Sequence, residues 1–170
     1  MNKLAHFILL AILISTPLTV SAAEPLLIYW NSEAGKTLRA RIPADADYWQ
    51  LSPWVAEQIN QTYCSVASAI TLLNAMPIKK PFDPVYAPNA YFTQSNYFTP
   101  EVINVISPQT ELAQGMKRDE MVETLLGQGV EATSIAGDVL DDKALRTLLQ
   151  KAQGDDGQFV LANYLHSAVG

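Results

Sequence analysis

Residues 58–76 of the chain read QINQTYCSVASAITLLNAM, and this stretch decides the fold. Apolar residues recur along it at intervals of three and four, which predicts a helix over residues 63–76 that ends before Pro77. Small residues lie between the apolar ones and allow close packing on several sides. We therefore expect this helix to be buried inside a domain rather than to lie on its surface.

Cys64 is the only cysteine of the chain and stands at the start of the predicted helix. A lone cysteine is most often a buried structural thiol. At a helix start, however, unpaired backbone N–H groups and the positive end of the helix dipole stabilise a thiolate, which makes the sulfur nucleophilic. Gln58 lies six residues upstream, where its amide can fold back beside the sulfur. Together with the Cys64 N–H, it can donate to the oxyanion that forms when a thiolate attacks a carbonyl.

The composition excludes several classes of protein. The chain has 170 residues, enough for one domain with a hydrophobic core, and its net charge is −6 without clusters of lysine or arginine. A nucleic-acid binder needs such clusters to neutralise phosphates. A single cysteine excludes a disulfide framework and cysteine-rich metal sites, and two histidines make a multi-histidine site improbable. We expect no cofactor and no bound catalytic metal.

The first 22 residues have the form of a secretory signal. Lys3 precedes an apolar run over residues 7–14, and small residues precede a cleavage point after Ala22 or Ala23. The run is too short to span a bilayer, which takes roughly 20 residues. We predict cleavage that leaves a domain of residues 23–170, with an uncleaved anchor as the alternative. Signals of this style are typical of bacterial export, so the expected location is the periplasm, with no membrane attachment after cleavage.

The remaining patterns predict an α+β protein. Pro- and aromatic-rich residues 77–108 are expected to be irregular but packed, with short helical turns. Further helices are predicted to start at Ser52-Pro53-Trp54 and to cover residues 117–126 and 142–152, the last one capped by Asp141 or Asp142. Strands are predicted over residues 130–135 and 159–165, and residues 154–157 form a turn between the last helix and the last strand. Residues 26–30 are predicted to be a first strand or an extended entry segment.

Several of these stretches together resemble the catalytic domain of phytochelatin synthases, which are papain-like enzymes that act on glutathione. The resemblance covers residues from about Trp54 to Gly170. The matching stretches are residues 58–76, FTQSNYF at 92–98, QGM at 114–116 and FVLANYL at 159–165. The form is that of the short prokaryotic members, without a cysteine-rich C-terminal region. The resemblance implies a papain-like fold with a helical lobe that carries the nucleophile and an antiparallel β lobe, incomplete at the C-terminus of this chain.

The resemblance also implies roles for the residues around the cysteine. Cys64 matches the nucleophile that becomes acylated, and Gln58 matches the side chain of the oxyanion hole. Tyr63 and Ser65 flank the nucleophile and are expected on the substrate side. Ser65 replaces the glycine that commonly follows the nucleophile, and its larger side chain could narrow the site.

Two residues near the end of the chain complete the expected substrate-binding set. Asn163 matches a residue near the bound γ-glutamylcysteinyl group. His166 falls where the family is expected to have an arginine that holds the substrate carboxylate. Read without the family, His166 would be the general base, because a cysteine nucleophile of this type needs a histidine. The resemblance instead implies a catalytic histidine shortly beyond Gly170, with its aspartate further on.

Three functions remain open at this stage. The leading hypothesis is a glutathione γ-glutamylcysteine dipeptidyltransferase or hydrolase, in which Cys64 forms a thioester, glycine leaves, and the product is phytochelatin or γ-glutamylcysteine. A metal ion would enter only as a glutathione thiolate complex. The alternatives are a papain-like peptidase of other specificity and a non-catalytic periplasmic binding domain. The oligomeric state is open, a homodimer included.

Overall fold

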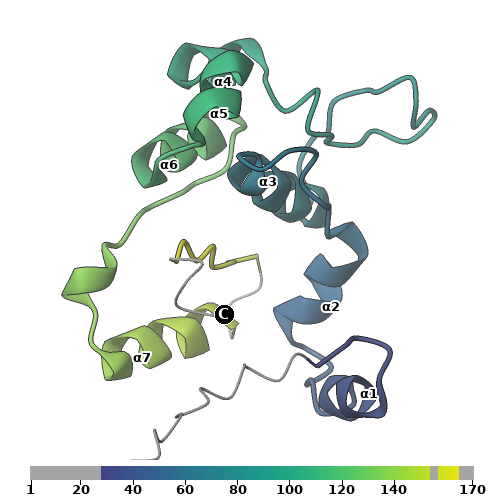
Figure 1. The fold of residues 1–170 in the computed structure, drawn as a ribbon, viewed down its shortest axis with the longest axis vertical. Helices are drawn as coiled ribbons and strands as arrows, with labels where there is room; N and C mark the ends of the chain where they lie inside the picture. The colour runs from purple at the N-terminus through teal and green to yellow at the C-terminus, as the bar shows by residue number, and fades with distance from the viewer. Residues whose placement is uncertain (1–27, 154–156, 165–170) are drawn as a thin grey trace, which may run out of the picture.

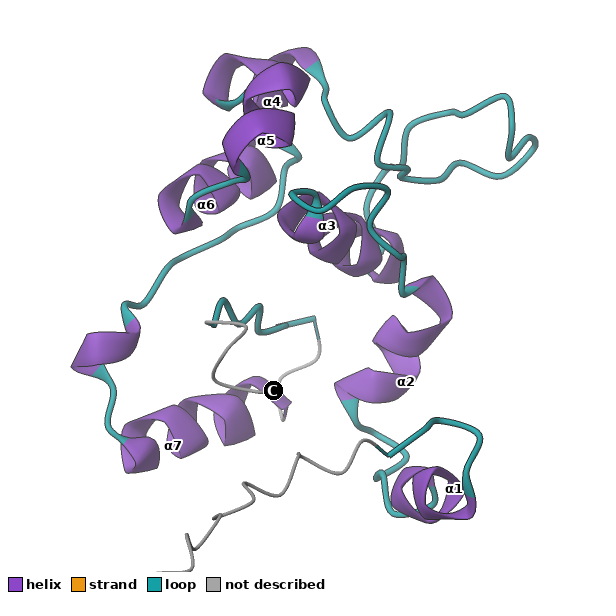
Figure 2. Cartoon of the chain, viewed as in Figure 1, coloured by secondary structure: helices purple, strands orange, loops and turns teal. Residues whose placement is uncertain are grey.

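The computed structural model describes residues 28–153 and 157–164, and these residues form a helical structure (Figures 1 and 2). The helices are α1 (Glu33–Arg39), α2 (Asp47–Leu51), α3 (Cys64–Ala75), α4 (Pro100–Val105), α5 (Pro108–Gln114), α6 (Arg118–Gly127) and α7 (Asp142–Gln153), with 3-10 turns η1 (Ser52–Trp54) and η2 (Gly137–Val139). The predicted signal over residues 1–22, the turn residues 154–156 and His166 lie outside the described residues. Among the residues described, no helix is long and apolar enough to cross a membrane.

Helix α3 is the centre of the hydrophobic core, as its sequence predicts. It begins at Cys64 and ends at Ala75, within one residue of the predicted bounds. Its buried residues are Val66, Ala67, Ala69, Ile70, Leu72, Leu73 and Asn74. Side chains from later segments pack against it, namely Phe92, Tyr97, Val102, Leu125 and Val130. The prediction of a helix buried on several sides is confirmed, although Cys64 and Ser68 remain exposed on one strip.

A buried polar pair fixes the irregular segment after α3 to the helix. The side chain of Asn74, which is 1% exposed, donates from Nδ2 to the carbonyl of Phe92 at 2.9 Å and accepts from the Phe92 N–H at 2.9 Å. Phe92 therefore enters the core with its backbone N–H and carbonyl both hydrogen-bonded. In most irregular segments these groups bond to water at the protein surface instead. The pair joins two of the sequence stretches on which the family resemblance rests.

Helices α4 and α6 pack on one another, and Val102 of α4 and Leu125 of α6 join the core around α3 (Figure 1). The starts of α4 and α5 have the expected chemistry, since Thr99 and Ser107 cap these helices and a proline follows each cap. The helix predicted over residues 117–126 is confirmed as α6. Its buried residues are Leu125 and Thr124, whose hydroxyl donates to the Met121 carbonyl oxygen at 2.9 Å, while Leu126 is half exposed. Thr124 is buried because its hydroxyl bonds to the Tyr97 hydroxyl at 2.8 Å.

Helix α7 follows an extended connection that lies apart from the other helices in Figure 2. The predicted cap is confirmed, because Asp141 Oδ1 accepts from the Ala144 N–H at 2.7 Å. The apolar residues of α7 are only partly covered by the described residues: Ala152 is buried, whereas Leu145 and Leu149 are exposed.

The predicted strands are wrong for the residues that the structure describes. Residues 28–30, 130–135 and 159–164 form no ladder, and the one sheet-like contact among described residues is an isolated antiparallel bridge between Phe82 and Ala90. The sequence pattern identifies segments with β propensity, but a strand also needs a neighbour to accept its backbone hydrogen bonds. The α+β expectation is therefore met only in its helical part.

The predicted helix start at Ser52-Pro53-Trp54 is also wrong. These residues form η1, which follows directly on α2. Ser52 has the helical angles φ −58° and ψ −32° rather than the extended conformation of an N-cap, because the helix has already begun at Asp47. Pro53 lacks the N–H that would continue the α-helical ladder, so the chain tightens into a 3-10 turn instead.

The Asn74–Phe92 pair gives a test of this architecture. Asn74→Ala leaves two buried backbone groups of Phe92 without partners, so we expect it to lower the free energy of unfolding by about 2–4 kcal/mol. Asn104→Ala, on the exposed side of α4, should change it by less than about 0.5 kcal/mol. Urea titration followed by circular dichroism measures both. Equal midpoints for the two variants would contradict the structural role of the pair.

Candidate active site

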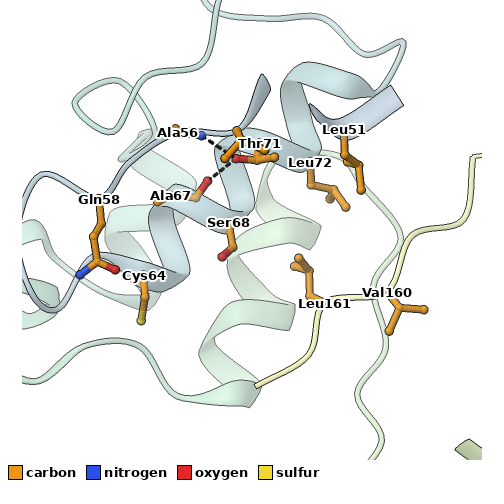
Figure 3. A pocket seen from close by; sticks show the side chains of 11 residues that line it. Leu51, Ala56, Gln58, Cys64, Ala67, Ser68, Thr71, Leu72, Val160 and Leu161 are labelled. Carbon is orange, nitrogen blue, oxygen red and sulfur yellow. Dashed lines mark hydrogen bonds between the residues drawn. The ribbon is translucent and has the colours of Figure 1, made fainter. Parts of the chain in front are cut away.

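A groove of about 350 Å³ opens beside the start of α3 (Figure 3). Most of its wall is apolar, and its polar members are Gln58, Cys64, Ser68 and Thr71. The apolar lining residues are Leu51, Val55, Ala56, Ala67, Leu72, Val160 and Leu161. The groove thus combines the two residues predicted to carry the chemistry with a surface suited to an apolar part of a substrate.

Cys64 occupies the first turn of α3, and its side chain projects into the groove (Figure 3). Its sulfur is exposed and lies 3.9 Å from the Thr62 carbonyl oxygen and 4.0 Å from Ser65 Oγ. The preceding residue, Tyr63, is the N-cap and makes no side-chain capping bond, so no side chain of this cap competes for the amides of the first turn. Exposure argues against the structural-thiol interpretation, because inert cysteines are typically buried.

Gln58 lines the groove together with Cys64, and Figure 3 shows the two side chains next to one another. Gln58 Nε2 donates to the carbonyl of Asn60 at 2.7 Å. A carboxamide nitrogen carries two protons, so this bond orients the amide and leaves its second N–H available. Figure 3 shows the amide oxygen on the side of the sulfur and the nitrogen on the far side, so the amide has to turn over before an N–H can donate to an oxyanion at Cys64.

Gln94 holds the backbone on both sides of Gln58. Its Nε2 donates to the carbonyl of Glu57 at 2.7 Å, and its Oε1 accepts from the N–H of Ile59 at 3.1 Å. The Gln94 side chain is buried, at 8% exposure. The segment that carries Gln58 is therefore fixed to the core by a residue far away in sequence, although Gln58 itself is exposed.

The turn between Gln58 and Cys64 is also fixed from two sides. Asn60 Oδ1 accepts from the N–H and the hydroxyl of Thr62 at 3.0 and 2.8 Å, which closes the turn. Gly115 packs against this turn, because a side-chain Cβ added to Gly115 would lie only 3.6 Å from the carbonyl oxygen of Thr62. Gly115 also has a φ of +73°, which favours glycine and explains why this residue type stands at the end of α5.

The two residues that flank Cys64 point away from the groove. Tyr63 is buried, its ring lies 5.9 Å from that of Phe98, and its hydroxyl donates to the Pro108 carbonyl at 3.5 Å. Ser65 donates to Oε1 of Glu111 at 3.3 Å. Neither lines the groove, so their expected contacts with substrate stay predictions.

Asn163 is exposed and does not line the groove, whereas Val160 and Leu161 of the same segment do. The structure thus brings the FVLANYL stretch to the nucleophile, but through residues other than the predicted one. His166 lies outside the described residues, so its role also stays a prediction.

Two chemical features define what the described part of the site contains. No lysine or arginine lines the groove, and no histidine is present among residues 28–153 and 157–164. Within the same residues, no group of three metal-ligating side chains comes together. The described site therefore supplies a nucleophile, an oriented amide and apolar surface, and no imidazole faces Cys64 within it.

Sequence reasoning missed Glu111 and Gln94. Glu111 is fully buried, and this burial raises its pKa, the hydrogen bond from Ser65 lowers it, and the charge of Glu120 raises it again, with a net increase. Burial also raises the pKa of Tyr63, and the charge of Glu111 raises it further. No local pattern distinguishes Glu111 from a solvated acid on a helix, and Gln94 could be noticed only as part of the FTQSNYF stretch.

Comparison with known families gives a match over most of the chain. The family model described as phytochelatin synthase matches residues 20–170. This range includes every residue of the groove. A search of curated proteins finds no match.

The exposure of Cys64 leads to a direct test. Native protein should incorporate one iodoacetamide label without denaturant, because the sulfur is accessible in the folded state. Mass spectrometry of the intact protein measures the label, and Cys64→Ser should incorporate none. Labelling that requires urea would contradict the exposed site.

Proposed function

Because the chain belongs to the phytochelatin synthase family, we propose that it transfers or hydrolyses the γ-glutamylcysteinyl group of glutathione through Cys64. Membership implies an acyltransferase or peptidase type of enzyme and glutathione as its substrate. The single observation that carries the finer proposal is the meeting of Cys64 and Gln58 at one groove.

The proposed first step is attack of the Cys64 thiolate on the carbonyl carbon of the Cys–Gly peptide bond. A carbon–sulfur bond forms and the carbonyl oxygen takes up the negative charge. The second N–H of Gln58 and the backbone N–H of Cys64 donate to this oxygen. Collapse of the intermediate breaks the carbon–nitrogen bond, the proton that the Cys64 thiol gave up passes to the departing nitrogen, glycine leaves, and a thioester remains on Cys64.

The proposed second step resolves the thioester. Attack by the amine of a second glutathione gives phytochelatin, and attack by water gives γ-glutamylcysteine. In both cases the Cys64 thiol is regenerated. We propose hydrolysis as the dominant outcome, as expected for the short form of the family. Metal ions enter as thiolate complexes of glutathione, and hence as part of the substrate.

The character of the groove supports an assignment of substrate parts. Its apolar wall next to Cys64 suits the cysteinyl portion of glutathione, whereas none of the groove side chains described carries a positive charge for the two carboxylates of glutathione. The proposal predicts that the protein cleaves glutathione faster than ordinary peptides. A peptidase of other specificity would cleave ordinary peptides at least as fast as glutathione. A panel of glutathione and unmodified tripeptides tests the difference.

The nucleophile gives the primary test. Full-length protein should release glycine from glutathione, and Cys64→Ala should abolish the release, because no thioester can form without the sulfur. Free glycine and γ-glutamylcysteine are measured by mass spectrometry. Persistent glycine release by the variant would rule out the mechanism. Absence of release by the wild type would favour the non-catalytic binding domain.

The oxyanion donor has a matched control in the same turn. Gln58→Ala should lower kcat for glycine release by about 10²–10³-fold with little change in KM, because its amide bonds to a charge that exists only in the transition state. Gln61→Ala removes an exposed amide three residues away that does not line the groove and should leave kcat unchanged. Equal effects of the two variants would exclude an oxyanion role for Gln58.

Gln94 should act on the same step through Gln58. Gln94→Ala frees the backbone at Glu57 and Ile59, so we expect kcat to fall on the order of 10- to 100-fold as Gln58 loses its position. Gln128→Ala removes an equivalent bond, from Nε2 to the Tyr97 carbonyl at 2.8 Å, away from the groove. Stability and kcat are measured for both. A loss of stability without a loss of kcat at Gln94 would contradict the positioning role.

A further inference from the structure

The mechanism makes no use of a carboxyl group that lies directly behind the nucleophile. Glu111 on α5 is 0% exposed. Its Oε1 lies 3.3 Å from Ser65 Oγ, and its Oε2 is buried with no hydrogen-bond partner. A buried carboxyl with one bond is unusual, because buried polar atoms are nearly always paired.

The groups that face Glu111 do not compensate a negative charge. They are Ser65 and Tyr63 at the start of α3, Tyr97 in the segment before α4, and Glu120 on α6. The two ion pairs formed among described residues, at Glu33 and Asp119, involve neither Glu111 nor Glu120. The pKa of Tyr97 is raised to about 12, mainly by burial. The hydrogen bond with Thr124 acts to lower this pKa, and the charge of Glu111 acts to raise it. An uncompensated carboxyl in such surroundings favours its neutral form.

In the neutral form, the proton is better placed on Oε1 than on Oε2. At Oε2 the hydroxyl would be a buried donor without an acceptor. At Oε1 it can donate to Ser65 Oγ, and Oε2 then remains only an under-satisfied carbonyl oxygen, which proteins tolerate better. A neutral Glu111 therefore acts as a donor toward Ser65.

Ser65 links this carboxyl to the sulfur. Its hydroxyl has one proton and can donate in one direction at a time. When Glu111 is ionised, the proton of Ser65 is directed to Oε1. When Glu111 is neutral and donates to Ser65 Oγ, the Ser65 proton is released to turn toward Cys64 Sγ, 4.0 Å away.

We infer that Glu111 is a positioning residue that, through Ser65, directs a hydroxyl proton toward the Cys64 sulfur when the carboxyl is neutral and away from it when the carboxyl is ionised. The inference rests on the proposed role of Cys64 as nucleophile. It adds to that role a donor on the core side of the thiolate, independent of Gln58 on the groove side. It also gives Ser65 a function that glycine at the same position could not perform.

The first test removes and restores the hydroxyl. Iodoacetamide alkylation of Cys64 in full-length protein is followed from pH 5 to pH 9. Ser65→Ala should slow alkylation about two- to tenfold, the range of one hydrogen bond, at the acidic end of this range, where the Glu111 carboxyl is neutral and the Ser65 hydroxyl turns to the sulfur. Ser65→Thr keeps the hydroxyl and should restore the rate. An unchanged rate in Ser65→Ala, or an equal loss in both variants, overturns the inference.

The second test changes the carboxyl. In Glu111→Gln, the amide nitrogen takes the position of Oε1 and donates to Ser65 at every pH, because at the position of Oε2 it would be a buried donor without an acceptor. The ratio of its alkylation rate to that of wild type should be near one at acidic pH and rise as Glu111 ionises in wild type. Glu123→Gln, which neutralises an exposed acid on α6, should keep a ratio near one throughout. A constant ratio for Glu111→Gln overturns the inference.

Unfolding provides a readout that does not depend on Cys64. The pKa of Glu111 is raised in the folded state, so the folded protein binds more protons than the unfolded one and loses stability as pH rises. The stability of Glu111→Gln relative to wild type should therefore increase with pH, and a constant difference contradicts the neutral carboxyl. None of these measurements uses glutathione. Failure of glycine release thus rejects the proposed function, whereas unchanged alkylation profiles reject this inference alone.

Discussion

The structure depends on one constraint: α3 must be buried almost all round and still present its first residue to solvent. Leu73 and Val66 lie at 0% exposure on this helix, whereas Cys64 is exposed. Burial fixes the direction of the helix, and hence the position of the sulfur, because a packed core allows little movement of its backbone. The exposed strip of α3 then becomes one wall of the groove (Figure 3).

Side-chain amides carry much of the remaining organisation. Asn74 pairs with the backbone of Phe92, and Gln94 pairs with the backbone on both sides of Gln58. Both amides reach irregular segments, whose backbone groups have no ladder of their own to satisfy them. Two residues of one stretch, Phe92 and Gln94, thereby connect the core helix to the backbone around Gln58. This explains how an irregular segment can keep Gln58 in place at the groove, a task for which loops are otherwise less precise.

The groove and the core meet at Ser65. On one side of α3 the sulfur faces apolar groove residues, and on the other side Glu111 lies in the core without a cation. A low-dielectric environment strengthens electrostatic interactions between such groups, so a single proton on Glu111 has a larger effect here than at the surface. The proposed coupling between Glu111 and Cys64 follows from this arrangement, in which only one hydroxyl separates them.

The sequence by itself determined α3, α6 and α7, a cap of α7 at Asp141 or Asp142, and the closeness of Cys64 and Gln58, because each follows from spacing within a few residues. It misplaced the helix start at Ser52 and predicted strands that the described residues do not form, since a strand depends on a partner that spacing cannot supply. Only the tertiary structure placed Gln94 beside Gln58 and Glu111 behind Ser65. These contacts join residues 35 to 46 positions apart in sequence, and their energies come from burial and from hydrogen bonds between segments that local patterns do not relate.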